Sequence, residues 1–447
     1  MITPRTLKGF RDYPPALMMP REQLLEKARQ VYRAYGFAPI DTPALEYAEI
    51  LLGKGGEESD KIVYRFKDHG DRDVALRFDL TVPFARFAAQ YIGELGVPFK
   101  RYAMGPVWRG ENTGHGRYRE FWQCDFDIIG TTANAADIEI VLVINDLMTA
   151  LGFDRFVIRL NNRQVLNGVL AGLGVEERSA SILRALDKFD KIGREGVIAE
   201  LCETTANRAN LTVSQAEQIL AVTTGFQDAN NSDILTTLRQ RVGSEGPGKL
   251  GLDRLEQLLT VAVSAGIPEG RLRLDPSICR GLDYYTGTIY ETILLDLPGI
   301  GSVCSGGRYD NLAGLYTKQQ LSGVGASLGL DRLLAAMEEL KLLPAVATPV
   351  SVLMVQFDGT RLGDYQRVAR WLRSQGIGVE VYPEAKKIGQ QLQYAEKRGF
   401  RLALIAGSDE FARGEWKIKN LTQRQEKTVA ESGLVEALRA ELAGSPP

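Results

Sequence analysis

The chain has 447 residues, of which 44% are hydrophobic, and this length and composition suffice for two or three domains with packed cores. A disordered or fibrous protein is therefore excluded. The 54 Lys and Arg residues nearly balance the 56 Asp and Glu residues, and the resulting net charge of −2 argues against a non-specific nucleic-acid binder. Any contact with RNA must be local.

The cysteine spacing and the scarcity of histidine exclude further classes. Four cysteines lie far apart without a Cys-x-x-Cys pair, and the histidines are His69 and His115 alone. These features argue against a disulfide framework, a cysteine zinc site and a Ser-His-Asp hydrolase, and we expect no tightly bound metal. No apolar run approaches the ~18 residues of a membrane span, so we expect a cytoplasmic protein without membrane contact.

The N-terminal part predicts one helix followed by strands. Apolar residues at helical spacing indicate an amphipathic helix with Pro20 in its first turn and Gly36 at its end. A strand over 37–40 stops at Pro43. Three later strands are predicted over 74–81, 99–108 and 121–129. The last two flank a polar loop, 109–119, in hairpin fashion.

The middle and the C-terminal part each change the pattern. A predicted helix over 137–151 is followed, over 175–259, by charged, Ala/Leu-rich segments that indicate a helical insertion. Strand-like sequence resumes over 272–295, and 322–337 predicts a strand running into a helix. After a linker-like segment, 341–349, strands and helices alternate. This alternation predicts a small α/β domain with a parallel sheet, and its charge balance is slightly positive.

Polar side chains alternate with apolar ones in two of the predicted strands. Strand geometry places alternate residues on one face, which in 121–128 holds Phe121, Gln123, Asp125 and Asp127. The same geometry in 74–81 groups Arg77, Asp79 and Thr81. Two such faces could line a pocket, although an antiparallel sheet that is wetted on one side gives the same pattern.

Arginines in two segments are suited to polyphosphate. The loop RGENTGHGRYR at 109–119 offers forked donors that pair with phosphate oxygens, although a merely solvated loop could have this composition. Arg332 lies in the first turn of the predicted helix after Gly329, where the helix dipole disfavours a cation unless an anion also binds. Pairing with Glu338 or Glu339 is the alternative. Neither a dinucleotide fingerprint nor a P-loop motif occurs.

Four segments together carry a resemblance to a known family. They are LRFDLTVPFAR (76–86), YAMGPVWRGENTGHGRYREFWQCDFDIIG (102–130), RGLDYYTGTIYE (280–291) with SGGRYDNL (305–312), and GVGASLGLDRLL (323–334). Over essentially its whole length the chain resembles the histidine–tRNA ligases (histidyl-tRNA synthetases), which are class II aminoacyl-tRNA synthetases. The RGLDYY and GGRYD pair is the specific signal. The HIGH and KMSKS motifs of class I synthetases are missing from the sequence.

The resemblance implies an α+β catalytic domain, a class II antiparallel sheet flanked by helices, with a helical insertion and a C-terminal α/β anticodon-binding domain. The implied bounds are 1–174 and 260–340 for the catalytic domain, 175–259 for the insertion, 341–349 for a linker and 350–447 for the anticodon-binding domain. Pro43 matches the family's dimer-forming motif and implies a homodimer, although a proline that only ends a strand is the simpler interpretation.

The resemblance also implies the reaction and its residues. The carboxylate of L-histidine attacks the α-phosphorus of ATP, which arrives with Mg²⁺, and the adenylate then esterifies tRNA(His). Such in-line chemistry needs alignment and charge neutralisation. Catalysis is assigned to Arg109 and Arg280. The implied ATP-binding residues are Arg109, Glu111, Arg117, Phe121 and Arg332.

For histidine, the implied residues divide into two groups. Around the α-amino group they are Asp79, Thr81 and Gln123, and near the imidazole they are Asp127, Tyr285 and Tyr309. A carboxylate and phenols suit an imidazole because an apolar competitor would leave them without hydrogen bonds. Many bacterial members of the family carry Glu where this chain has Asp79 and Asp127.

A non-catalytic relative is the alternative interpretation. The synthetase-like regulatory subunit of ATP phosphoribosyltransferase keeps the catalytic fold but generally lacks the C-terminal domain. This chain has a C-terminal α/β segment and the whole arginine set, so we expect an enzyme.

Overall fold

The computed structural model describes residues 1–53, 62–186, 188–204, 209–226, 228–278, 284–343 and 348–443. Arg280 lies outside these described residues. The chain divides into two units: the first comprises Met1–Arg11 and Leu24–Lys341, and the second comprises Asp12–Gln23 and the residues from Leu342 onward.

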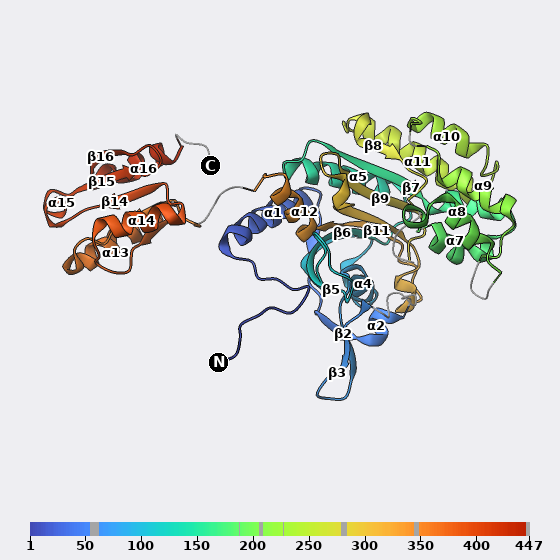
Figure 1. The fold of residues 1–447 in the computed structure, drawn as a ribbon, viewed down its shortest axis with the longest axis horizontal. Helices are drawn as coiled ribbons and strands as arrows, with labels where there is room; N and C mark the ends of the chain where they lie inside the picture. Colours follow the sequence, from blue (N-terminus) through green and yellow to red (C-terminus); the bar gives the residue numbers. More distant parts are fainter. Residues whose placement is uncertain are drawn as a thin grey trace. The chain divides into compact units, whose positions relative to one another are not determined.

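An eight-stranded sheet forms the centre of the first unit, in the order β1-β5-β6-β11-β10-β9-β7-β8 (Figure 1). Its strands are β1 (Ala38–Pro39), β5 (Phe99–Trp108), β6 (Glu120–Ile129), β7 (Phe156–Asn162), β8 (Leu272–Leu274), β9 (Thr288–Leu294), β10 (Cys304–Tyr309) and β11 (Gly323–Gly329). All pairs from β5 to β7 are antiparallel, whereas β1 and β8 are parallel to their neighbours at the two edges. The predicted antiparallel sheet is confirmed.

The two faces of β6 have the predicted opposite character. On one face, Tyr32 of α1 (Pro15–Ala34) stacks on Phe126 with ring centroids 4.9 Å apart, and its hydroxyl donates to the main-chain oxygen of Cys124. Asp125 and Asp127 lie on the other face and are also buried. Strand alternation therefore separates an apolar helix contact from a buried acidic surface.

Two predictions near the N-terminus are wrong. The strand predicted over 74–81 is only β4 (Asp73–Leu76), because the side chain of Asp79 accepts a hydrogen bond from the Val82 amide and helix α4 (Thr81–Leu95) begins there. This strand belongs to a separate sheet with the order β2-β4-β3, whose other strands are β2 (Leu45–Tyr47) and β3 (Arg65–Lys67).

The first helix also begins earlier than predicted. Pro15 opens α1, as its fixed φ angle favours at a helix start, so Pro20 lies inside the helix rather than in its first turn. The amide of Leu17 donates to the main-chain oxygen of Pro14 within this start.

The remaining helices of the first unit form two groups. Those connected directly to the sheet strands are α2 (Ala48–Leu52), α5 (Asn134–Ala150), α6 (Arg163–Gly172) and α12 (Leu330–Glu339). The segment predicted as an insertion contains α7 (Ser179–Leu186), α8 (Phe189–Cys202), α9 (Val213–Thr223), α10 (Asn231–Arg239) and α11 (Pro247–Ser264). Figure 1 shows this second group beside β7 and β8, and a separate apolar cluster joins α6 to α9.

The second unit has a five-stranded sheet in the order β13-β12-β14-β15-β16. Its strands are β12 (Val352–Met354), β13 (Val379–Val381), β14 (Leu402–Ile405), β15 (Glu415–Asn420) and β16 (Gln425–Ala430), and its helices are α13 (Leu362–Ser374), α14 (Ile388–Arg398), α15 (Ser408–Arg413) and α16 (Leu434–Ala443). The first three strands are parallel as predicted, but the β15–β16 hairpin is antiparallel. The prediction of a purely parallel sheet is therefore wrong.

Across the described ranges, no helix combines the length and the apolar character that a membrane crossing requires.

Candidate active site

Three arginines from two distant segments approach one another at the start of α12. Arg109 and Arg117 belong to the loop between β5 and β6, and Arg332 lies in the first turn of α12. Burial and the positive charges of Arg117 and Arg109 lower the pKa of Arg332, so both arginines are close enough to Arg332 to repel its charge. A cluster of like charges at a helix N-terminus favours an anionic ligand.

The loop is held against α12 from both sides. A methyl group at Gly116 would lie 3.5 Å from the Cα atom of Arg332, and Arg332 itself donates to the main-chain oxygen of Ser302 rather than to a glutamate of its own helix. From the N-terminal segment, Arg11 donates to the hydroxyl of Tyr118 and lies 3.5 Å from Asp331. The loop is thus part of an ordered network and is not merely solvated.

Arg109 occupies the space between this loop and the start of α4. Its Nε atom donates to the main-chain oxygen of Phe78 at 2.9 Å, and its guanidinium carbon lies 5.2 Å from the ring centroid of Phe121. Glu111 is 4.0 Å from Arg109. Phe121 packs at the edge of an apolar cluster around Leu80, so its ring is fixed beside the arginine.

Asp79 is a buried carboxylate at the start of α4, in a group of buried polar side chains. One oxygen of its carboxylate caps α4, and the other accepts a hydrogen bond from the hydroxyl of Tyr284 at 3.1 Å. Burial raises the pKa of Asp79, and the positive charge of Arg109 opposes this rise. The Thr81 hydroxyl reaches Asp125 at 3.5 Å, which connects α4 to β6.

Asp127 is a second buried carboxylate of this polar group. It accepts a hydrogen bond from the hydroxyl of Tyr309 at 2.7 Å, and its other oxygen lies 2.7 Å from Nη2 of Arg101. The ring of Tyr284 meets that of Tyr309 edge-on with centroids 5.9 Å apart. Carboxylate and phenol groups from three segments therefore surround one buried space.

Glycines in the neighbouring strands make room for these side chains. Gly325 pairs in register with Asp127, and a methyl group at Gly325 would overlap the aspartate carboxylate. In the same way, a methyl group at Gly323 would overlap the ring of Tyr309. At these two positions β11 therefore offers only main chain, and the side chains of Asp127 from β6 and Tyr309 from β10 lie against it.

The structure also places the other predicted residues. Gln123 lies on the same face of β6, and its Oε1 atom is buried without a hydrogen-bond partner among the described residues. The ring of Tyr285 meets that of Tyr284 edge-on at 5.2 Å. Arg77, which was predicted to share the polar face with Asp79, instead donates to the main-chain oxygens of Pro106 and Thr42 and has a structural role.

Sequence reasoning missed three residues of the cavity: Arg101, Tyr284 and Asp125. Tyr284 belongs to the quoted RGLDYY motif, and Asp125 falls on the predicted polar face of β6, so a signal for both was present in the sequence. Burial raises the pKa of Asp125 to about 7, and the nearby charge of Asp127 contributes to this rise. For Arg101, the sequence offered only its position in the predicted strand over 99–108, which pairs with the strand that holds Asp127.

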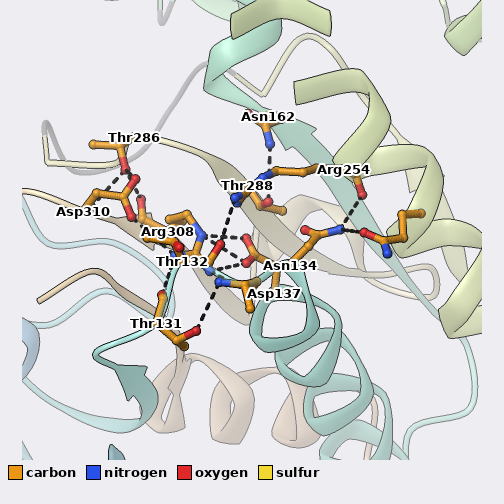
Figure 2. Close-up of polar contacts among 12 residues, drawn as sticks. Thr131, Thr132, Asn134, Asp137, Asn162, Arg254, Thr286, Thr288, Arg308 and Asp310 are labelled. Carbon is orange, nitrogen blue, oxygen red and sulfur yellow. Dashed lines mark hydrogen bonds and ion pairs between the residues drawn. The ribbon is translucent and has the colours of Figure 1, made fainter. Parts of the chain in front are cut away.

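The opposite face of β10 carries a second polar network, shown in Figure 2. Arg308 donates to both oxygens of Asp137 at the start of α5, to the main-chain oxygens of Thr131 and Ala133, and to Asp310. The Thr286 hydroxyl donates to Asp310 at 2.6 Å, and the Thr286 amide donates to the main-chain oxygen of Arg308. This network fixes the chain on either side of Tyr309 and just after Tyr285.

Comparisons with known proteins agree with this arrangement. The family described as histidyl-tRNA synthetase matches residues 9–333, and the anticodon binding domain family matches residues 350–441. Similar proteins include the histidine–tRNA ligase of Rhodopirellula baltica, 54% identical over 98% of this chain and 99% of that protein. Another is the histidine–tRNA ligase of Wolinella succinogenes, 45% identical over 96% of each.

The solved structures give the same result. The crystal structure of histidyl-tRNA synthetase from a Nostoc species is 33% identical, with a TM-score of 0.86 over 98% of this chain and all of that one. Both the antiparallel central sheet and the separate C-terminal domain are therefore those of a class II enzyme. From the sequence matches and this fold together, the chain belongs to the histidyl-tRNA synthetase family.

Proposed function

We propose that this chain joins L-histidine to tRNA(His) in two steps, through a histidyl-adenylate, and releases diphosphate and AMP. The observation that carries this proposal is the approach of Arg109, Arg117 and Arg332 beside a buried cavity of carboxylates and phenols. In-line attack on a phosphorus atom is accelerated chiefly by alignment and by neutralisation of the developing charge. The arginines supply the charge, and the cavity holds the attacking amino acid.

On the ATP side, each arginine has a proposed place. Arg109, which lies between the histidine cavity and Phe121, would hold the α-phosphate where the two substrates meet. Arg332 at the helix N-terminus would meet the γ-phosphate, Glu111 and Arg117 of the loop would close over the nucleotide, and Phe121 would stack on adenine. We propose Arg280 as the second α-phosphate ligand. Magnesium would arrive with ATP.

On the histidine side, acceptors and donors match the two polar ends of the amino acid. The buried Oε1 atom of Gln123 would accept a hydrogen bond from the α-ammonium group, beside Asp79 and Thr81. Asp127 and Tyr309, which already form a hydrogen bond, would meet the imidazole together with Tyr285. An apolar amino acid of similar size would leave these buried groups unpaired, and this cost provides selectivity.

The regulatory-subunit alternative is not favoured. The two relatives described above are named histidine–tRNA ligase and match almost the whole chain, including the C-terminal domain. We propose that this domain contacts the anticodon of tRNA(His). A chain that lacks residues 346–447 should keep adenylate formation but lose efficiency in tRNA charging, and undiminished charging would contradict this role.

We also propose that the chain acts as a homodimer in the cytoplasm. Directly after Pro43, Leu45 and Tyr47 of β2 are exposed, and Phe66 of β3 is exposed on the same small sheet. Tyr47 and Phe66 both pair in register with Val74, so they share one face that a second copy would cover. Light scattering should give twice the chain mass, and Tyr47→Glu with Phe66→Glu should give monomers.

The test of the main proposal is histidine-dependent exchange of diphosphate into ATP. The full chain with histidine, ATP and Mg²⁺ should catalyse this exchange, and other amino acids should not support it. Arg280→Ala should lower the rate by at least ~100-fold with little change in histidine affinity, because its charge is needed mainly in the transition state. Absence of any exchange by the unaltered chain would refute the proposed function.

A further inference from the structure

Arg101 is a buried arginine at the edge of the histidine cavity. It lies in β5, pairs in register with Asp127 of β6, and its side chain is 0% exposed. Its guanidinium carbon stacks 4.4 Å from the ring centroid of Phe84, and its Nη2 atom donates to the main-chain oxygen of Leu80 at 3.1 Å. The side chain is therefore fixed in one position.

The hydrogen-bonding capacity of Arg101 is mostly unused. Its Nη2 atom lies 2.7 Å from Asp127 and 3.8 Å from Asp125, but its Nε and Nη1 atoms are buried and have no hydrogen-bond partner in the part of the chain that the structure describes. A buried guanidinium with so few bonds costs stability. Its main compensation is the charge of the two carboxylates.

The charges around Asp127 explain why such a cation is needed. Three buried aspartates, Asp79, Asp125 and Asp127, share the cavity, and the phenols of Tyr285 and Tyr309 face them from other segments. Burial raises the pKa of Asp127, Asp79 raises it further, and Arg101 is the strongest influence in the opposite direction. Without the positive charge of Arg101, repulsion among the carboxylates would raise their pKa values and favour the retention of a proton on one of them.

We propose that Arg101 is a positioning residue for the substrate: it lies between Asp125 and Asp127 and keeps the Asp127 carboxylate ionised and directed toward the imidazole of histidine. This inference rests on the proposed function. Arg101 touches neither substrate in this scheme and acts through Asp127, whose carboxylate lies 2.7 Å from its Nη2 atom. Because burial raises the pKa of Asp125 to about 7, Asp125 contributes little negative charge on the acid side of neutral pH, and Asp127 is the carboxylate that pairs with the cation there.

The inference predicts different effects for two substitutions. The measurement is kcat/KM for histidine in the exchange reaction between pH 5.5 and pH 9. Arg101→Met removes the cation, so the acid limb of the profile should move to higher pH by about one unit or more, with at least a ~10-fold rise in histidine KM at pH 7. Asp125→Asn places a neutral side chain where the Asp125 carboxyl, with its raised pKa of about 7, is already mostly neutral on the acid side, so the limb should stay in place.

Two further variants separate positioning from general damage. Arg101→Lys keeps the charge and should restore most of the histidine KM and the position of the acid limb. Arg159→Met makes the same chemical change at an arginine of β7 that is 41% exposed and paired with Asp275, and it should leave both quantities unchanged. The KM for ATP should change less than about threefold in every variant. The titration of free histidine affects the unaltered chain and all variants equally, so it does not contribute to the differences between their pH profiles.

The outcomes distinguish this inference from the proposed function. If the unaltered chain shows no exchange, the proposed function fails, and this inference fails with it. If the unaltered chain is active but Arg101→Met leaves the acid limb in place, or Asp125→Asn moves it to higher pH as far as Arg101→Met does, the role of Arg101 is overturned. Should Arg101→Met fail to fold, Arg101→Gln, which also removes the charge, is measured in its place with the same expected shift.

Discussion

The two faces of the central sheet each bury an arginine, and the two arginines are bonded very differently. Arg308 faces α5, is 1% exposed, and uses all three guanidinium nitrogens on Asp137, Asp310 and main-chain oxygens. Arg101 faces the cavity and donates one hydrogen bond to a main-chain oxygen. Burial alone therefore does not distinguish the two arginines, whereas the number of hydrogen bonds that each guanidinium donates does.

The difference follows from what each face must do. A side chain between a sheet and a helix can recover its desolvation cost only from protein acceptors, so its full set of bonds must be present in the folded chain. The charge of a side chain beside a binding site must suit the ligand. Such a side chain can therefore be retained even when some of its hydrogen-bond donors have no protein acceptor. The face toward α5 thus carries an arginine with all three nitrogens bonded, and the opposite face carries one with two unused nitrogens among the described residues.

The largest effect expected from this comparison is on stability. Arg308→Met leaves Asp137 as an uncompensated buried charge and should cost about 3–5 kcal/mol, measured as a shift of the urea midpoint. The double variant Arg308→Met with Asp137→Leu removes both charges and should recover at least about half of this loss. A loss below about 1 kcal/mol in the single variant would show that the bonds of Arg308 do not stabilise the sheet.

On the face that carries Asp127, we expect a smaller loss of stability than for Arg308→Met, together with weaker histidine binding. Gly325→Ala places a methyl group against the Asp127 carboxylate and the main-chain oxygen of Phe126, and the main chain cannot move aside. We expect about 1–3 kcal/mol of destabilisation and at least a ~10-fold higher histidine KM in the exchange assay. Gly93→Ala in α4, where the added methyl meets nothing within 4 Å, is the matched control: it should leave the histidine KM unchanged and, because alanine favours a helix over glycine, should not destabilise the chain.

The smallest expected effect concerns the pH dependence of stability. The pKa of Asp125 is about 7 in the folded chain and near 3.8 when exposed, so the folded chain holds the proton more tightly. Folded stability is therefore lost as the pH rises from about 4 to about 7, and Asp125→Asn should not share this loss. We expect its stability advantage to grow by about 1 kcal/mol between pH 6.3 and pH 8, measured by urea unfolding. A constant difference would contradict the raised pKa.

Much of the sheet could be predicted because its strands have regular alternation. The strand predicted over 99–108 is β5 itself, and the turn from β11 into α12 lies where GVGASLG meets the helical pattern. The opposite faces of β6 followed from alternation alone, and the family resemblance pointed to residues that the fold brings together in one region. Local periodicity and family motifs were sufficient for these features.

Other features depend on contacts that no local pattern reveals. Asp79 looked like a strand residue because Arg77, Asp79 and Thr81 alternate, but its carboxylate caps a helix. The role of Arg101 follows from its register with Asp127, which is a tertiary fact. The β15–β16 hairpin was missed because every residue of β16 is exposed or only half-buried, which leaves no apolar alternation to detect.

The pairing of β6 with β11 has a consequence for biosynthesis. Tyr309 and Asp127 are 182 residues apart in sequence, and β11, which lies between β6 and β10, follows both of them in the chain. During synthesis, the proposed amino-acid site therefore lacks β11 on one side until about three quarters of the chain has been translated. By then the whole helical insertion has already been made. Bringing the two ends of so long a segment together costs conformational entropy, and the strand pairing that offsets this cost forms only after β11 has been translated. Ribosome-bound fragments that stop short of Gly323 should consequently be unable to retain histidine.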